Sequence, residues 1–313
     1  MKVLVTGAAG FIGSHLSEAL AREGHRVVGV DAFTDFYDIG LKEENARAAL
    51  AAGAEIHRLD LASDDLSEVL DGADVIYHLA AQPGLSSRTS FDDYARNNIF
   101  ATQRLLEAID RARLSPRFLN IATSSVYGAL ATGDETTAPT PSSVYGVTKL
   151  AAEQLVLARH REGLLRACSL RIFSVYGPRE RPDKLYAKLI RSILEDREIP
   201  LHEGSEEHRR SFSFIGDIVR GLLAALERWD AACGEIFNIG SDVETTTGDG
   251  LALVERLTGK RARLVRAPKR PGDQLRTCAN IGRARALLGY APTTTLEEGL
   301  RAEIAWFRTK LAA

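Results

Sequence analysis

The chain has 313 residues, of which 45% are apolar and 26% are charged, and these are the proportions of a soluble globular protein. Forty basic residues nearly balance forty-two acidic ones, leaving a formal charge of −2. That balance offers no general attraction to nucleic acid or to an anionic membrane, and the absence of any long apolar window excludes a membrane-spanning helix. A phosphate-bearing ligand must therefore be held by a few individually placed groups.

The cysteines and the first residues indicate the compartment. Cys168, Cys233 and Cys278 are odd in number and widely spaced, with no C-x-x-C pair. This usage is typical of reduced thiols in a cytosolic protein rather than of a disulfide or zinc framework. Residues 1–7 enter a core strand at once and leave no room for a signal peptide. We therefore expect a cytoplasmic protein without a bound metal.

The chain up to about residue 177 alternates short apolar runs with amphipathic stretches of helical length. Continuous runs of Val, Ile and Leu are typical of strands that are covered on both faces. Strands and helices in alternation predict a doubly wound α/β fold, the parallel sheet of a Rossmann domain. The predicted strands are residues 2–6, 26–31, 55–60, 74–79, 117–122 and 166–172, and the predicted helices are residues 11–23, 91–112 and 144–161.

After Gly177 the pattern changes, because prolines at 178, 182 and 200 interrupt the chain. We expect a smaller α/β lobe that closes over the carboxyl edge of the sheet and binds the substrate. The expected domains are residues 1–177 and 178–313, with some elements of the second part returning to the first. The lobe is predicted to hold a helix at 185–195, a polar loop at 203–210, a strand at 235–239, a helix at 250–257 and a Pro/Arg-rich stretch at 268–273.

Gly7, Gly10 and Gly13 lie between the first predicted strand and the first predicted helix. Glycines allow backbone N–H groups to approach a pyrophosphate, and the positive end of the following helix completes such an anion site. Asp31 ends the second strand, where an acidic residue can bind a ribose diol and would repel a 2′-phosphate. Asp60, at the end of the third strand, is a candidate for the adenine amino group or for an N-cap. The pattern favours NAD over NADP; the alternatives are an ordinary glycine turn and a solvated aspartate.

Tyr145 and Lys149 are four residues apart, so on a helix their side chains lie on one face. A nearby ammonium group stabilises a phenolate, and we expect the pKa of Tyr145 to lie below its usual value of about 10. The tyrosine could then act as a general base near neutrality. Thr123, Ser124 and Ser125 follow the strand at 117–122, at the end where ligands bind in parallel sheets. The alternatives are a surface Tyr–Lys pair and a Ser/Thr turn.

Over essentially the whole chain, these motifs resemble the extended short-chain dehydrogenase/reductase family, whose members are mostly nucleotide-sugar epimerases, dehydratases and decarboxylases with tightly held NAD. The resemblance implies an NAD cofactor, a nucleotide-sugar substrate and a homodimer formed by the helices at 91–112 and 144–161. It implies catalytic roles for Thr123, Tyr145 and Lys149. The residues that it implies for NAD binding are Gly7, Gly10, Phe11, Ile12, Gly13, Asp31, Asp60, Leu61, Leu79, Ala80, Ala81, Asn98, Ala122, Tyr145, Lys149, Phe173 and Val175.

The two positions after Thr123 distinguish the reactions of this family. The similar 4,6-dehydratases carry Asp-Glu there, and UDP-glucuronate decarboxylases carry Ser-Glu, whereas this chain has Ser124 and Ser125. A dehydratase without a general acid would lose about 10²–10⁴ in rate. Elimination is therefore set aside in favour of 4-epimerisation or 4-oxidoreduction, with both serines expected to bind substrate.

A second string, from Arg171 to Asp183, is similar to the stretch in UDP-glucuronate 4-epimerases in which Arg-Pro-Asp follows a Tyr-Gly-Pro turn. By that resemblance Ser174 and Arg181 would bind the carboxylate at carbon 6 of the sugar. A guanidinium can hold such a group by charge-assisted hydrogen bonds. Oxidation at carbon 4 produces a β-keto acid, and an epimerase must keep it from losing CO₂. The alternative for Arg181 is a surface arginine after a turn.

Other substrate residues follow from the same resemblance. Arg210 and Arg270 match arginines that hold the diphosphate, and Asp273 closes the family string that begins at Arg270. The chain also departs from the pattern, since an aromatic residue at the base pocket is replaced within residues 202–206 and Ser211 follows Arg210 where the family has Asp. Arg88 stands two positions after the place where glucuronate epimerases often carry an arginine.

The sequence therefore predicts an NAD-dependent 4-epimerase that converts UDP-glucuronate to UDP-galacturonate through a 4-keto intermediate. One alternative is an NDP-sugar 4-ketoreductase, or a 4-epimerase of a neutral or unusual NDP-hexose. The alternative of another class is a catalytically silent NAD-binding regulatory protein.

Overall fold

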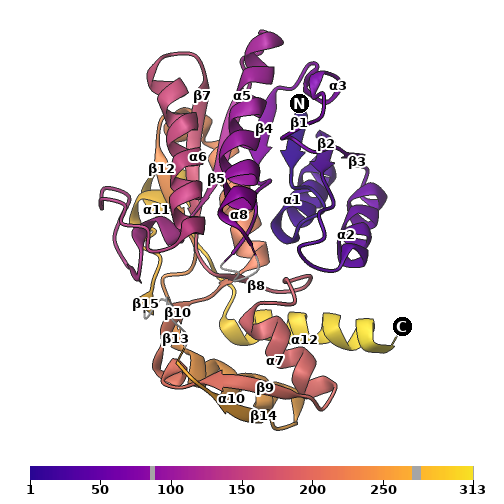
Figure 1. Cartoon of the computed structure of the whole chain (residues 1–313), viewed down its shortest axis with the longest axis vertical. Coiled ribbons are helices and arrows are strands. Elements are labelled where there is room, and N and C mark those ends of the chain that lie inside the picture. Colours follow the sequence, from indigo (N-terminus) through magenta and orange to yellow (C-terminus); the bar gives the residue numbers. More distant parts are fainter. Residues whose placement is uncertain (85–88, 270–275, 313) are drawn as a thin grey trace.

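The computed structural model describes residues 1–84, 89–269 and 276–312. Its centre is a seven-stranded sheet in which every neighbouring pair is parallel (Figure 1). The chain winds outward from β1 in both directions, which is the doubly wound arrangement, and the expected α/β Rossmann fold is confirmed. In spatial order the strands are β12 (Ile236–Ile239), β7 (Arg166–Ile172), β5 (Arg117–Thr123), β4 (Val75–His78), β1 (Lys2–Thr6), β2 (Arg26–Asp31) and β3 (Glu55–Arg58).

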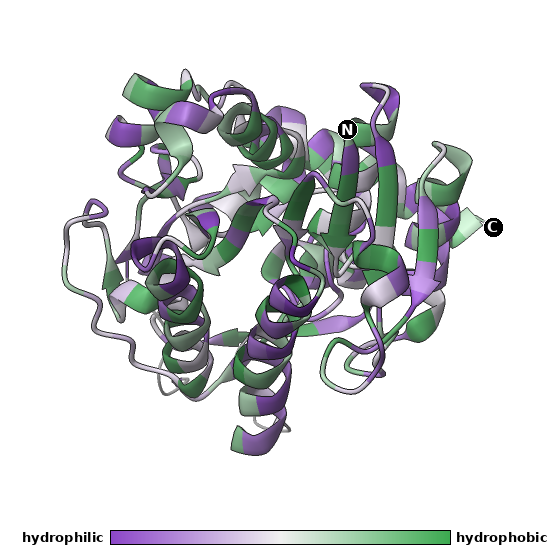
Figure 2. Cartoon of the chain, turned by 90° about the horizontal axis from the view of Figure 1, so that it is seen from above, coloured by the Kyte–Doolittle hydropathy of each residue, from purple (hydrophilic) through white to green (hydrophobic). Residues whose placement is uncertain are grey.

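Helices cover both faces of this sheet. Along β1, Val3 and Val5 pack into the apolar cluster on one face, and Leu4 packs into the cluster on the other. Because both faces are buried, the strands are mainly apolar, while the helices are polar on their outer sides (Figure 2). One face carries α1 (Phe11–Arg22), α2 (Ile39–Ala51), α8 (Ile215–Glu227), α9 (Trp229–Ala232) and α11 (Gly282–Leu288); the other carries α3 (Ser67–Leu70), α4 (Phe91–Tyr94), η1 (Ala95–Phe100), α5 (Ala101–Arg111) and α6 (Val144–Arg161).

The helix predicted at residues 91–112 has an irregular first half. A four-residue α-helix, α4, passes into the π-helical turn η1 before regular α-helix resumes in α5. A π-turn widens the helix, and such turns are frequent at functional sites. Within η1, the side chains of Asn97 and Asn98 face in different directions.

A smaller lobe lies below the carboxyl edge of the central sheet (Figure 1). Its apolar core includes Tyr176, Tyr186, Ile190, Leu300 and Ile304. Three small sheets run in the orders β13-β10-β15-β6, β11-β8 and β14-β9. These and the remaining elements are β6 (Leu130–Ala131), β8 (Val175–Tyr176), β9 (Glu198–His202), β10 (Arg209–Ser211), β11 (Ser213–Phe214), β13 (Glu244–Thr246), β14 (Arg263–Ala267), β15 (Arg276–Thr277), η2 (Ser124–Tyr127), η3 (Ser205–Glu207), α7 (Leu185–Leu194), α10 (Thr247–Thr258) and α12 (Leu296–Ala312).

Two boundaries in the lobe differ from the prediction. The segment 203–210, expected to be a loop, contains the short helix η3 and the start of β10. Helix α10 begins at Thr247, earlier than expected, because the Thr246 hydroxyl accepts a hydrogen bond from the Asp249 N–H and caps it. In the described part of the chain, no helix is long and apolar enough to cross a membrane.

Candidate active site

The turn between β1 and α1, with Gly7, Gly10 and Gly13, packs its backbone closely against neighbouring segments. We call this turn the glycine cradle. Gly7 has φ of +72°, and a Cβ on it would lie 2.9 Å from the Ala80 nitrogen. A Cβ on Gly13 would lie 2.1 Å from the Gly7 carbonyl oxygen. A side chain at position 13 is thus sterically excluded, as expected where a helix must approach a strand closely in a dinucleotide site. The glycines and the start of α1 line a cavity of about 620 Å³.

Most of the predicted site residues gather around this one cavity. Asn98 is an exception among the described residues, and Arg88, Arg270 and Asp273 lie outside the described part of the chain. The predicted residues that line the cavity are Gly7, Gly10, Phe11, Ile12, Gly13, Asp31, Asp60, Leu61, Leu79, Ala80, Ala81, Ala122, Thr123, Ser124, Ser125, Tyr145, Lys149, Phe173, Ser174, Val175, Arg181 and Arg210.

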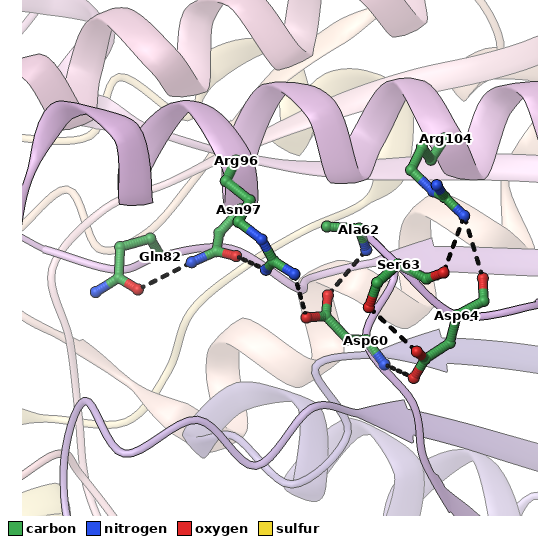
Figure 3. Close-up of polar contacts among 8 residues, drawn as sticks. All are labelled: Asp60, Ala62, Ser63, Asp64, Gln82, Arg96, Asn97 and Arg104. Carbon is green, nitrogen blue, oxygen red and sulfur yellow. Dashed lines mark hydrogen bonds and ion pairs between the residues drawn. The ribbon is translucent and has the colours of Figure 1, made fainter.

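Asp31 and Asp60 both face the cavity while bonded to the loops beside them. The Asp31 carboxylate accepts hydrogen bonds from the N–H groups of Ala9 at 3.1 Å and Phe33 at 2.8 Å. The Asp60 carboxylate accepts one from the Ala62 N–H and forms an ion pair with Arg96 at 2.7 Å (Figure 3). These bonds fix the direction of each carboxylate at the ends of β2 and β3.

The π-turn brings Asn97, rather than the predicted Asn98, to the cavity. Asn97 bonds to Arg96 and to the Gln82 side chain, continuing the polar chain that starts at Asp60 (Figure 3). The Asn98 amide is buried, accepting from the Gln82 N–H at 2.7 Å and donating to the Thr148 hydroxyl at 2.9 Å. Asn98 is not among the residues that line the cavity, and its amide ties the loop at Gln82 to α6. Its role in cofactor binding stays a prediction.

Tyr145 and Lys149 project from the first turns of α6, which begins at an N-cap formed by Ser143. Burial raises the pKa of Tyr145, and this outweighs the lowering by a hydrogen bond with Thr123 and by the charge of Arg181. The Lys149 ammonium instead donates to the Ile121 carbonyl oxygen at 2.7 Å. The prediction that Lys149 lowers the pKa of Tyr145 is therefore wrong: the pKa is raised, and Lys149 is not among the groups that lower it. Burial also lowers the pKa of Lys149 to about 8.

Arg181 is not a surface arginine, because it is only 8% exposed. Its guanidinium bonds to Asp183 at 3.0 Å, and its centre stands 5.5 Å from that of the Phe36 ring. It also packs against Gly84, where a Cβ would lie 2.8 Å from it. Within the described residues its Nε has no hydrogen-bond partner. Arg181 lines the same cavity as Tyr145 and its charge acts on the phenol, so a largely buried cation lies near the tyrosine.

The sequence interpretation missed several residues of the cavity, three of which lie close together in the chain. Phe36, Tyr37 and Lys42 follow Asp31 and line the cavity between the two lobes. The Lys42 ammonium is buried and donates to the Thr34 carbonyl at 2.7 Å. The available signal was two adjacent aromatic residues in a polar segment directly after the nucleotide-binding strand.

Across residues 1–84, 89–269 and 276–312, no three His, Cys, Asp or Glu side chains cluster as a metal site. The three thiols are unpaired, with Cys168 buried.

Comparison with known proteins identifies the class. Residues 3–240 match the model of the NAD dependent epimerase/dehydratase family. This chain belongs to that family, and its cofactor is NAD.

Three relatives illustrate the similarity. The chain is 40% identical over 311 residues to the uncharacterized UDP-glucose epimerase YtcB of Bacillus subtilis, covering 98% of each protein. It is 34% identical over 332 residues to UDP-glucuronate 4-epimerase 2 of Arabidopsis thaliana, covering 98% of this chain and 76% of the relative. The crystal structure of UDP-glucuronic acid 4-epimerase from Bacillus cereus, in complex with UDP-glucuronic acid and NAD, superposes with a TM-score of 0.93 at 40% identity, covering 99% of this chain and 100% of the other.

Proposed function

We propose that this enzyme interconverts UDP-glucuronate and UDP-galacturonate by epimerisation at carbon 4. The observation that carries the proposal is the largely buried guanidinium of Arg181, which lines the cavity and lies near enough to Tyr145 for its charge to act on the phenol. A cation in that position suits a sugar with a carboxylate at carbon 6. Ser124 and Ser125 add no carboxyl group, which is consistent with a reaction that eliminates no water.

The glycine cradle fits a dinucleotide, because α1 begins so close to the preceding turn that a Cβ at Gly13 would lie 2.1 Å from the Gly7 carbonyl oxygen. We assign the pyrophosphate to Gly7, Gly10 and the start of α1, and the adenosine ribose to Asp31. Lys149 lies within the cavity near the Ile121 carbonyl, in reach of the second ribose. When bound, NAD supplies a hydride acceptor for carbon 4 and returns the hydride to the opposite face of the sugar.

Tyr145 is the proposed general base for the 4-hydroxyl. Its burial opposes the phenolate, so Thr123, Arg181 and the positive charge of the oxidised cofactor must all favour the ionised form. Thr123 also accepts a hydrogen bond from the Ser125 N–H at 3.1 Å, which fixes its hydroxyl beside the tyrosine. In this arrangement the threonine orients the reacting oxygen, and the tyrosine takes its proton and later gives it back.

Arg210 lies on β10 and lines the cavity at the lobe, and we propose that it binds the diphosphate of the substrate. Arg270 and Asp273, for which the same role was expected, remain predictions. Ser174, in the turn after β7, is proposed to share the sugar carboxylate with Arg181.

The domain division at residue 177, the cytoplasmic location and the homodimer are also proposals. Three elements after residue 177 belong to the first domain in space: β12 is part of the central sheet, and α8 and α11 pack on one face of that sheet. Phe91 and Phe100 are each 61% exposed on the helical segment beside α6, where Val147 is also exposed. Large apolar side chains exposed on two adjacent helices support a helical dimer interface. Analytical ultracentrifugation should give twice the 34.1 kDa mass of the chain.

A neutral UDP-hexose is the second candidate substrate. Asp183 already neutralises part of the Arg181 charge, and one relative is named a UDP-glucose epimerase. The test compares UDP-glucuronate and UDP-glucose with the wild type and Arg181→Gln. We expect the substitution to reduce kcat/KM for UDP-glucuronate by about 100-fold, as for loss of a charge-assisted hydrogen bond worth about 3 kcal/mol, and to leave UDP-glucose almost unchanged. Equal losses on both substrates would refute the assigned role of Arg181.

A further inference from the structure

The turn that carries Arg181 is attached to α1, the helix of the glycine cradle. The Arg179 guanidinium forms an ion pair with the Glu18 carboxylate and approaches the Ser14 hydroxyl at 3.4 Å. His15 donates from Nε2 to the Pro178 carbonyl oxygen at 3.0 Å. Burial lowers the pKa of His15, so its ring is neutral at physiological pH and needs that acceptor. Two consecutive residues of the turn are thus held by one face of α1.

The backbone at Arg179 has φ of +71°, a left-handed conformation that is unfavourable for any residue with a Cβ. Glycine would adopt it without strain. The arginine side chain must therefore gain enough from its partners on α1 to hold this conformation. Glu18 is itself nearly buried, which strengthens the attraction relative to a surface pair.

The following residue secures the other side of the turn. Glu180 is buried, and its carboxyl accepts a hydrogen bond from the Ala187 N–H in α7 at 3.2 Å. Residues 178 and 179 are thus fastened to the cofactor helix and residue 180 to the lobe. Arg181 projects from between these attachments into the cavity.

We propose that Arg179 and Glu18 are positioning residues that hold the Arg181 guanidinium in one orientation and so suppress decarboxylation of the 4-keto intermediate. This inference rests on the proposed function. In the competing reaction the bond between carbons 5 and 6 breaks, CO₂ leaves, and the electron pair moves to the oxygen at carbon 4 as an enolate. Carbon 5 then takes up a proton, and the hydride removed from carbon 4 stays with the cofactor, so no further oxidant is needed.

That bond breaks only when it lies parallel to the π orbitals of the carbonyl group at carbon 4. A guanidinium in a fixed position holds the carboxylate, and with it the sugar ring, away from that alignment. A guanidinium on a loosened turn still binds the carboxylate but permits rotation. The ion pair of Arg179 and Glu18 therefore affects the ratio of products more than the binding of substrate.

The test measures that ratio by proton NMR, as UDP-4-keto-pentose and UDP-pentose relative to UDP-galacturonate, for the wild type, Arg179→Gly and Glu18→Gln. Arg179→Gly removes the guanidinium without backbone strain. We expect it to raise the decarboxylated fraction by about tenfold, since small misplacements of a positioning group change rates by one to two orders of magnitude. Glu18→Gln should have a smaller effect in the same direction, and Arg179→Lys should restore most of the wild-type ratio.

The matched control is Arg22→Gln, which breaks the other ion pair of Glu18, at 2.9 Å, on a side chain that is 69% exposed and away from the turn. It should leave the ratio unchanged. A fall in total activity with an unchanged product ratio in both Arg179→Gly and Glu18→Gln would show a merely structural role and overturn the inference. If Arg179→Gly does not fold, the product ratio of Glu18→Gln decides the same question. Failure of the wild type to form UDP-galacturonate would instead refute the proposed function and remove the inference with it.

Discussion

A buried ion pair behind α6 offers the sharpest test of how the catalytic helix is held. Glu153 is fully buried and Arg171 is 2% exposed. Arg171 donates to both carboxylate oxygens of Glu153, at 3.0 and 2.7 Å, and to the Tyr127 hydroxyl at 2.8 Å. The Ser169 hydroxyl also donates to Glu153 at 2.9 Å. Glu153 lies one helical turn beyond Lys149, so the pair anchors the catalytic part of α6 to β7.

The perturbation is Glu153→Ala, which leaves the Arg171 charge buried without its partner. Removal of one member of such a pair costs about 3–5 kcal/mol. At about 2 °C per kcal/mol for a chain of this size, the melting temperature should fall by about 6–10 °C. The assay is thermal and urea unfolding followed by circular dichroism. The double variant Glu153→Ala/Arg171→Met should recover much of the loss, because it removes both charges.

Glu153→Gln adds a functional readout. The negative charge of Glu153 raises the pKa of Lys149 against the lowering by burial, so its removal should move that pKa further below about 8. The alkaline limb of the kcat profile should therefore shift to lower pH. A Glu153→Ala variant as stable as the wild type, or an unchanged pH profile in Glu153→Gln, would refute this account of the pair.

Three further predictions concern the cradle, the base and the lobe. Gly13→Ala places a methyl group 2.1 Å from the Gly7 carbonyl oxygen, so the purified variant should release far less NAD on denaturation than the wild type, measured by chromatography; equal NAD content would contradict the cradle. Tyr145→Phe should lower kcat by about 10²–10⁴ while retaining NAD, and near-normal turnover would exclude Tyr145 as the base. Burial raises the pKa of Glu180 to about 8 and, with the neighbouring Glu180, raises that of Glu303 on α12. The folded protein therefore holds protons that the unfolded chain has lost, and its stability should fall as pH rises from about 4.5 through 8. Glu303→Gln should flatten that dependence in melting curves, and an equally steep curve would contradict it.

The local motifs of the first half were predictable because each depends on neighbours in sequence. The strand–glycine turn–helix unit, Asp31 at the end of β2, and Tyr145 with Lys149 on α6 lie in the structure as the sequence pattern indicated. Six strands of the central sheet followed from the alternation of strands and helices. The seventh, β12, was predicted as a strand of the lobe and instead pairs with β7 at the edge of the sheet.

The features that the sequence did not predict arise from contacts between distant segments. Arg181 is buried because Phe36 and Gly84, from two other loops, close over it. The pKa of Tyr145 is raised because burial, which no local pattern reports, exceeds the effect of nearby groups. The π-turn η1, which turns Asn98 away from the cavity, lies inside a segment that the sequence predicts as one continuous helix at 91–112.

The most direct test of the proposed reaction is proton NMR of the purified enzyme with UDP-glucuronate and no added NAD. The account predicts that UDP-galacturonate accumulates to equilibrium, because the cofactor is retained and regenerated in each turnover. An unchanged spectrum from protein that carries NAD would contradict the glucuronate assignment, and accumulation of UDP-pentose as the main product would contradict epimerisation.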